Sequence, residues 1–204
     1  MAYILGFFAA DGYITLHKNG GLFWSIEITD KKLIMQIRKS IRSEHKITIR
    51  KGRNKNEKSL YRLQIGSKEM CNDLFKLGFH NKKTQTLTTP KVPHRYFPDF
   101  VRGYFDGDGN VWIGNVHKKR KTQTLVIQTA FTSSSVNFLR QLQLDLFKFG
   151  VERGSLYNSK KGYARLQFSV GDSLKLYKIM YNSNCYLFLN RKKIVFEKFI
   201  KMRL

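Results

Sequence analysis

Two aspartates occupy equivalent places in two related stretches of the sequence. Asp11 and Asp108 each follow a run of apolar and small residues, and each precedes a glycine. Aligned on Gly6 and Gly103, both stretches read Gly-aromatic-Phe-x-small-Asp-Gly. A single Asp-Gly after an apolar run is usually a helix-ending turn. Because the whole pattern occurs twice, it indicates instead a site that uses two carboxylates.

The spacing of small residues in both stretches predicts two helices that pack closely. Gly6 and Ala10, like Gly103 and Gly107, are four residues apart and lie on one helix face, where small residues let two backbones approach. Each aspartate would stand in the last helical turn, where the helix dipole disfavours a negative charge. Side-by-side packing would bring the two carboxylates together. Such carboxylates repel unless a cation neutralises them, and ligation by oxygen alone favours Mg²⁺.

Residues 4–12 and 101–109 resemble the motif of the LAGLIDADG homing endonuclease family, in its single-chain form with two motifs. The first copy departs from the family at Ala9, where an acid is common, whereas Asp106 keeps the acid in the second copy. The resemblance places the catalytic acids at Asp11 and Asp108. It implies a site-specific, Mg²⁺-dependent DNA endonuclease that hydrolyses both strands across the minor groove and leaves short 3′ overhangs.

The resemblance also implies cofactors and helper residues. The predicted metal site comprises Asp11, Asp108 and the residues before them, Ala10 and Gly107. We expect Mn²⁺ to substitute for Mg²⁺, and Ca²⁺ to support binding without efficient cleavage because it fixes ligand geometry less strictly. A basic residue beside each acid assists the chemistry in this family. The matching basic segments propose Lys83 and Lys192, with Lys82 and Lys193 as alternatives and a simple phosphate contact as the competing role.

The composition indicates a globular protein with a polyanionic partner. The formal net charge is +24, and it is shared equally between residues 1–98 and 99–204, so it belongs to a repeated architecture rather than to a basic tail. Hydrophobic residues make up 42% of the chain, yet no run of about 18 apolar residues predicts a membrane span. The N-terminus lacks the pattern of a signal peptide. We therefore expect an intracellular protein, with an organelle, a bacterial cytoplasm or a phage-infected cell left open.

Cysteine and histidine give no sign of another nuclease chemistry. Cys71 and Cys185 have no metal-ligand spacing and indicate reduced thiols. The chain has 5 histidines, which are scattered without a zinc or His-Asn-His pattern.

The two motifs begin two copies of one predicted architecture. Each copy has the order αββαββα, which predicts an α+β fold of two pseudo-symmetric repeats packed through their motif helices. We expect the N-terminal repeat at 1–87, a proline-containing linker at 88–99 and the C-terminal repeat at 100–204. In the C-terminal repeat, the helix after the first hairpin is expected to begin at Ser133 or Ser134 and to bury Val136. The antiparallel sheets would form a saddle that binds double-stranded DNA.

Alternating polar residues in the predicted strands form the candidate DNA-reading faces. Arginine can read guanine, and glutamine can read adenine, in the major groove. Lysine-rich loops are better suited to phosphates. The predicted DNA-binding residues are Ser25, Glu27, Thr29, Arg50, Arg62, Gln64, Lys118, Gln128, Arg165, Gln167, Lys160 and Lys161.

The two reading faces differ in sequence, which predicts a long, non-palindromic target. Aligning the repeats through Leu33 and Val136 sets Ser25, Glu27 and Thr29 against Gln128, Ala130 and Thr132. The pairs Arg62/Gln64 and Arg165/Gln167 are the same in both repeats. Because one chain carries both repeats, we expect a monomer.

Three functions compete for this sequence. The first is a homing endonuclease encoded in a mobile group I intron. The second is a LAGLIDADG-type RNA maturase or a regulator that does not cleave; such proteins often lose the motif acids, which are both present here. The third is a basic ribosomal or structural RNA-binding protein, which would not explain the duplicated motif.

Overall fold

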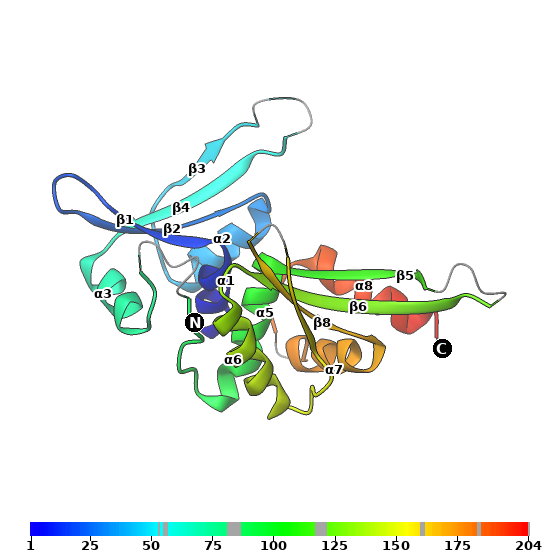
Figure 1. The fold of residues 1–204 in the computed structure, drawn as a ribbon. Helices are drawn as coiled ribbons and strands as arrows, with labels where there is room; N and C mark the ends of the chain where they lie inside the picture. Colours follow the sequence, from blue (N-terminus) through cyan, green and yellow to red (C-terminus); the bar gives the residue numbers. More distant parts are fainter. Residues whose placement is uncertain are drawn as a thin grey trace. The chain divides into compact units, whose positions relative to one another are not determined.

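A computed structural model describes the whole chain except residues 53, 55, 56, 81–86, 117–121, 160, 161, 183, 184 and 204. The described residues form seven α-helices, a short 3-10 helix and two four-stranded antiparallel sheets (Figure 1). They divide into unit 1, which comprises Met1–Lys83 and Pro90–Gly107, and unit 2, which comprises Thr84–Thr89 and Asp108–Leu204. None of the described helices has the length and apolar character needed to cross a membrane.

Unit 1 contains the first sheet, α1 and all of α5 except its last residue, Asp108. Its elements are α1 (Ala2–Asp11), β1 (Gly12–Leu16), β2 (Leu22–Ile28), α2 (Lys31–Ser40), β3 (Ile47–Arg50), β4 (Leu60–Gly66), α3 (Lys68–Lys76), the 3-10 helix η1 (His94–Tyr96) and α5 (Phe97–Asp108). The strand order is β1-β2-β4-β3. Pro98 lies at the second residue of α5, in its first turn, where a missing amide hydrogen costs no helical hydrogen bond.

The local sequence explains where the elements of unit 1 begin and end. The Asp30 side chain accepts a hydrogen bond from the Leu33 amide and caps α2, and Ser67 caps α3 through the Met70 amide. Gly78, just past α3, has a φ of 89°, a left-handed conformation that favours glycine and ends the helix.

The first sheet has an apolar face and a polar face. Ile14, Trp24, Ile26, Leu63 and Ile65 alternate along β1, β2 and β4 and are buried beneath α1, α2 and α3. The Trp24 indole donates a hydrogen bond to the Met70 sulfur of α3, and its ring meets Phe8 of α1 edge to face. Because strand residues alternate between faces, the intervening residues form the opposite, polar face.

The motif helices α1 and α5 cross with their backbones in direct contact. A Cβ atom added to Gly6 would overlap the Phe100 carbonyl oxygen, and one added to Gly103 would overlap the Tyr3 carbonyl oxygen. The two contacts are reciprocal, since Tyr3 and Phe100 each precede their own glycine by three residues. Gly6 and Gly103 therefore stand where the two helix backbones approach most closely, and neither position has room for a larger side chain.

Unit 2 repeats the order of the first sheet. Its elements are β5 (Gly109–Val116), β6 (Thr124–Ser133), α6 (Val136–Phe147), β7 (Ser155–Asn158), β8 (Ala164–Phe168), α7 (Val170–Met180) and α8 (Asn190–Lys201). The strand order is β5-β6-β8-β7, which matches β1-β2-β4-β3. Helices α6 and α7 pack on β6 and β8, and α8 packs on β5.

The start of α6 differs from the prediction. The capping residue is Ser135, whose hydroxyl accepts from the Phe138 amide, rather than Ser133 or Ser134. Ser133 belongs to β6 and its hydroxyl accepts a hydrogen bond from the Ser135 amide. In consequence Phe138 is fully buried, whereas Val136 is only half-buried.

This start corrects the alignment of the two repeats by two residues. Gly12 and Gly109, which follow the motif aspartates, lie opposite Ile26 and Phe131 in the strand registers. Ser25 therefore corresponds to Ala130 and Glu27 to Thr132. The predicted alignment of Ser25 with Gln128 was wrong because it matched Leu33 with Val136 rather than with Phe138.

Candidate functional site

The two motif aspartates end their helices and are exposed. Asp11 is the last residue of α1, and Asp108 is the last residue of α5. A Cβ atom on Gly107 would overlap the Ala10 Cβ and would lie 3.0 Å from Asp11 Oδ2. Gly107 thus leaves room for the Asp11 carboxylate. The four residues of the predicted metal site stand at the C-terminal ends of their helices.

The chemistry of these residues fits a hard divalent cation. Carboxylate and backbone carbonyl oxygens are the ligands that Mg²⁺ prefers, and the negative end of a helix dipole favours a cation. Within the residues that the structure describes, no group of three His, Cys, Asp or Glu side chains could hold a metal ion. The candidate donors are therefore the aspartates with backbone oxygens.

Asp106, the other acid of the second motif, is buried and hydrogen-bonded inside unit 1. It is only 1% exposed, and its Oδ2 atom accepts a hydrogen bond of 2.7 Å from the Tyr3 hydroxyl of α1. Buried Arg102 stacks over the same Tyr3 ring and pairs with Asp99 at 2.5 Å. The matching residue of the first motif is Ala9. Sequence reasoning missed this link because its two ends lie far apart in the chain.

The candidate catalytic lysine Lys192 contacts the end of the second motif. Its ammonium group is nearly buried and donates a 2.6 Å hydrogen bond to the carbonyl oxygen of Gly109, which directly follows Asp108. Lys193 instead lies 3.6 Å from the Glu197 carboxylate and over the Phe188 ring. Of the two alternatives, Lys192 therefore faces the motif. Lys82 and Lys83 lie outside the described residues.

The polar face of unit 1 holds one predicted arginine in a fixed cluster. Arg62 lies opposite Glu27 in the strand register, with 3.4 Å between its Nε and Glu27 Oε1. Its guanidinium stacks over the Tyr13 ring at 5.7 Å, and the Tyr13 hydroxyl donates to Glu27 at 2.7 Å. Burial and then Glu27 raise the pKa of Tyr13, and Arg62 opposes that rise. Tyr13 was missed in the sequence, although its place in the first hairpin could have revealed it.

Beside this cluster, polar side chains are enclosed without partners. Ser25 is fully buried on the polar face and lies opposite Gln64. Among the described residues, neither Ser25 Oγ nor Gln64 Nε2 has a hydrogen-bond partner, although both are shielded from solvent. Enclosed polar atoms are normally satisfied, so these two atoms are exceptions. Ser25 is covered by its neighbours, and the prediction that it contacts DNA stays a prediction.

The polar face of unit 2 differs around its arginine. Arg165 lies opposite Thr132, and Gln167 lies opposite Ala130. Thr132 has no carboxylate to pair with Arg165, whereas Glu27 faces Arg62. Like Arg62 Nε, Arg165 Nε is shielded and has no hydrogen-bond partner in the described part of the chain. Gln128 lies farther along β6, opposite Trp112, which is 44% exposed and was not predicted as a contact. Such an exposed aromatic ring can stack on or pack against a ligand.

The remaining predicted contacts divide into two groups. Arg50 is exposed on β3, on the same face as Arg62, and Thr29 is exposed in the bend after β2. Lys118, Lys160 and Lys161 lie outside the described residues.

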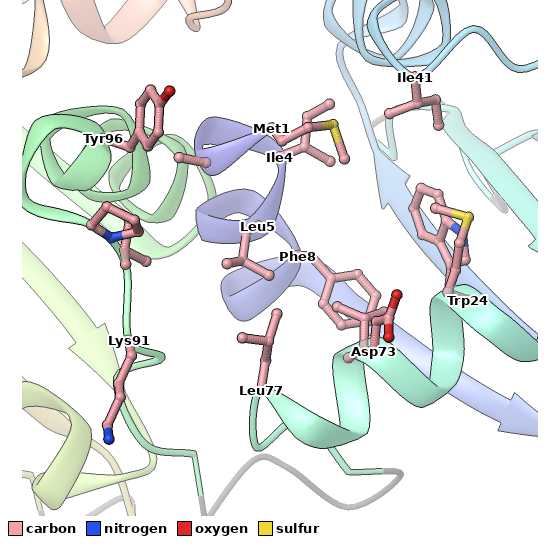
Figure 2. Close-up of a pocket in the computed structure, with 15 residues that line it drawn as sticks. Met1, Ile4, Leu5, Phe8, Trp24, Ile41, Asp73, Leu77, Lys91 and Tyr96 are labelled. Atoms are coloured by element: carbon pink, nitrogen blue, oxygen red, sulfur yellow. The ribbon is translucent and has the colours of Figure 1, made fainter.

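An apolar hollow of about 440 Å³ in unit 1 is not suited to this chemistry (Figure 2). Its walls include Leu5 and Phe8 of α1 and Trp24 of β2. Of its charged lining residues, Asp73 lies on α3 and Lys91 on the segment before η1, well apart from each other. Neither belongs to a motif.

Comparisons with known proteins agree with this architecture. The model of the LAGLIDADG-like domain family matches residues 1–77 and 99–190, which include both motifs. No curated protein sequence shows significant similarity to the chain.

Several solved structures share the fold. One is the homing endonuclease I-DmoI in complex with DNA and Ca, with 19% identity, a TM-score of 0.61, and coverage of 90% of this chain and 89% of that chain. A second is the LAGLIDADG meganuclease I-AabMI bound to uncleaved DNA, with 15% identity, a TM-score of 0.63, and coverage of 98% and 88%. A third is the I-SmaMI LAGLIDADG homing endonuclease bound to cleaved DNA, with 12% identity, a TM-score of 0.66, and coverage of 98% and 87%.

The family match spans most of the chain and both motif helices, and the neighbouring structures have the same two-repeat α+β fold. This chain belongs to the LAGLIDADG family and has the fold of its single-chain homing endonucleases.

Proposed function

We propose that the protein is a sequence-specific endonuclease that cuts both strands of a DNA duplex. The observation that carries the proposal is the duplicated motif, in which each of two glycine-packed helices ends in an exposed aspartate. The arginine and glutamine side chains on the two sheet faces support DNA binding there. Solved structures of the same fold contain bound DNA, and in one of them the DNA is cleaved.

In this proposal Asp11 and Asp108 hold divalent metal, Mg²⁺ in the cell, and each serves one strand. Bound metal would supply an activated water and stabilisation of the leaving oxygen. The backbone at Ala10 and Gly107 frames the carboxylates, and Gly107 keeps the space beside Asp11 clear. Lys192, held on the Gly109 carbonyl, orients the end of the second motif and presents a positive charge to a phosphate. Cleavage across the minor groove would leave short 3′ overhangs.

The sheet faces would supply recognition of a long, non-palindromic target by a monomer. Arg62 and Arg165 are suited to guanine, and Gln64 and Gln167 to adenine. Glu27 can accept from cytosine, whereas its counterpart Thr132 has a hydroxyl and a methyl group. A mobile group I intron as the source, and an intracellular site of action, remain part of this proposal.

The experiment is to incubate the protein with a randomised duplex library and Mg²⁺ and to sequence the cut ends. We expect one long sequence to be enriched, with both strands cut and 3′ overhangs. Mn²⁺ should replace Mg²⁺, and Ca²⁺ should leave binding without efficient cleavage. Full cleavage in EDTA would refute the metal mechanism. Binding without cleavage in any of these metals would favour a maturase or a regulator.

A further inference from the structure

The outer side of α2 carries a concentrated set of positive charges. Lys31, Lys32, Arg38, Lys39 and Arg42, which we call the α2 basic face, line one shallow hollow of about 840 Å³. All of them except half-buried Arg38 are exposed, and Glu44 is the only carboxylate among the lining residues.

The α2 basic face and the polar face of the first sheet point in opposite directions, because α2 covers the apolar side of that sheet. Helix α2 buries Leu33, Ile34 and Ile37 and packs on β4 from the apolar side of the sheet. A helix with its side chains is about 10 Å thick. A straight duplex on the polar face, where Arg62 and Gln64 stand, therefore cannot reach the cations on the outer side of α2.

Two observations indicate that the charges on α2 exceed what the overall basic composition of the chain would place there. Lys31 and Lys32 occupy the first turn of α2, where the helix dipole disfavours cations and where no acid is present. The corresponding helix of unit 2, α6, carries Arg140 and Asp145 as its only charged residues. The net charge is the same in both halves of the chain, so the contrast is local to this helix.

We propose that the α2 basic face binds the phosphate backbone of a second DNA duplex, so that one protein molecule can bridge two duplex segments. From Lys31 to Lys39 the row is about 12 Å long at 1.5 Å per residue, and Arg42 follows just past the helix end. That length faces about three to four phosphates of one strand at 3.4 Å each. The contacts are to phosphates alone, so this binding is independent of sequence. The proposal rests on the proposed function, because the first duplex occupies the polar sheet faces.

A capture experiment tests the bridge. A duplex of about 30 base pairs, far shorter than the persistence length of about 150 base pairs, is fixed to beads. The protein is bound in EDTA, unbound protein is washed away, and a fluorescent duplex of unrelated sequence is added. We expect capture of the second duplex. Failure to bind the first duplex would overturn the proposed function, whereas binding of the first without capture of the second would overturn only the bridge.

A charge-removing variant and a matched control locate the second site. The test variant combines Lys31→Gln, Lys32→Gln and Lys39→Gln. It should keep its fold, since removing Lys31 and Lys32 from the first turn relieves an unfavourable dipole interaction, which offsets the loss of Lys39 from the last turn. The control combines Lys178→Gln, Lys198→Gln and Lys201→Gln, which are exposed lysines on α7 and α8. Both variants lose the same net charge.

The test variant should bind the first duplex as the wild type does and capture the second at least about tenfold less. The slope of log capture against log salt concentration should become less negative by about 3 in this variant, at roughly 0.9 per lost phosphate contact. The control should capture normally. Equal losses in both variants, unchanged capture by the test variant, or loss of the first duplex would each overturn the assignment. Capture of an RNA duplex in preference to DNA would overturn the choice of ligand.

Discussion

The polar faces of the two sheets place the same Arg-Gln pair in different surroundings. In unit 1, Arg62 lies between the Tyr13 ring and the Glu27 carboxylate. In unit 2, the equivalent Arg165 lies opposite Thr132, which offers no carboxylate. The Nε atoms of both arginines are shielded and make no hydrogen bond in the described part of the chain. The motif helices, in contrast, repeat the same glycines and aspartates. The two repeats are therefore alike at the motif helices, where backbones touch and an aspartate ends each helix. They differ on the polar sheet faces, where side chains point away from the core.

The largest expected effect tests the part that the two repeats share. Asp11→Asn or Asp108→Asn should each reduce double-strand cleavage by about a hundredfold to ten-thousandfold, since a metal ligand contributes several kcal/mol and 1.36 kcal/mol is tenfold in rate. DNA binding should persist or tighten, because a negative charge beside phosphate is removed. Single-turnover cleavage and gel-shift binding measure the two effects.

The control for the aspartates is Asp73→Asn, which changes an exposed aspartate of α3 that pairs with exposed Lys76. It should cut at the wild-type rate. Either motif variant cutting both strands at that rate would contradict the assignment.

A smaller effect tests the shared helix crossing. Gly6→Ala and Gly103→Ala should each lower the free energy of unfolding by about 1–3 kcal/mol, because the added methyl group meets a backbone carbonyl that cannot rotate away. Denaturant unfolding measures this. Gly171→Ala in α7 is the matched control, since its Cβ would meet nothing within 4 Å. It should be neutral or stabilise the fold by up to about 1 kcal/mol. Equal effects of all three would show that the crossing is not tight.

The sequence predicts the framework because its signals are local or repeated. Hairpin alternation placed Glu27, Arg62 and Gln64 on one face, and the spacing of small residues around Gly6 and Gly103 predicted that the two motif helices approach closely. The cap of α6 was missed because Ser133, Ser134 and Ser135 are equally good caps by sequence. Because Val136 is apolar, it was matched with Leu33 in place of Phe138, which shifted the predicted alignment by two residues.

The rest of the site depends on contacts that no local pattern encodes. Tyr3 and Asp106 meet only because α1 and α5 cross, and Lys192 reaches Gly109 from the far end of the chain. The burial of Ser25 likewise follows from neighbouring strands that pack around it. These relations arise from tertiary packing, which composition and spacing do not report.

The difference between the sheet faces predicts an asymmetric target. Binding should be measured to the selected site and to two palindromes, each built from one half-site. Each mismatched base pair costs about 1–3 kcal/mol, so both palindromes should bind more weakly than the natural arrangement. The corrected alignment places the strongest contrast at Glu27 and Thr132. Equal binding to all three duplexes, or two chains per duplex in ultracentrifugation, would contradict this prediction.

The smallest expected effect separates the two arginines directly. Glu27→Gln should remove the ion pair with Arg62 and leave the guanidinium less constrained. The free energy of unfolding should fall by about 0.2–1 kcal/mol, as for a partly exposed ion pair. Discrimination at the base pair that Arg62 contacts should fall, while overall DNA affinity should rise because a carboxylate near phosphate is removed. Thr132→Glu is the reciprocal change and should have the opposite effects at the half-site of unit 2. No change in discrimination from either variant would show that the pairing does not tune recognition.

Tyr13 gives this last prediction an independent readout. Its pKa is raised above the ordinary value of 10.0, first by burial and then by the hydrogen bond to Glu27. A raised pKa favours the neutral phenol in the folded state, so its stabilising contribution is present below about pH 10 and is lost as the pH rises above it. In Glu27→Gln the pKa of Tyr13 should fall towards its ordinary value, and the loss of stability at alkaline pH should become shallower. Spectrophotometric titration, with Tyr13→Phe subtracted as the blank, follows this single phenol. An unchanged titration would mean that burial alone sets the pKa and that Glu27 does not hold the cluster.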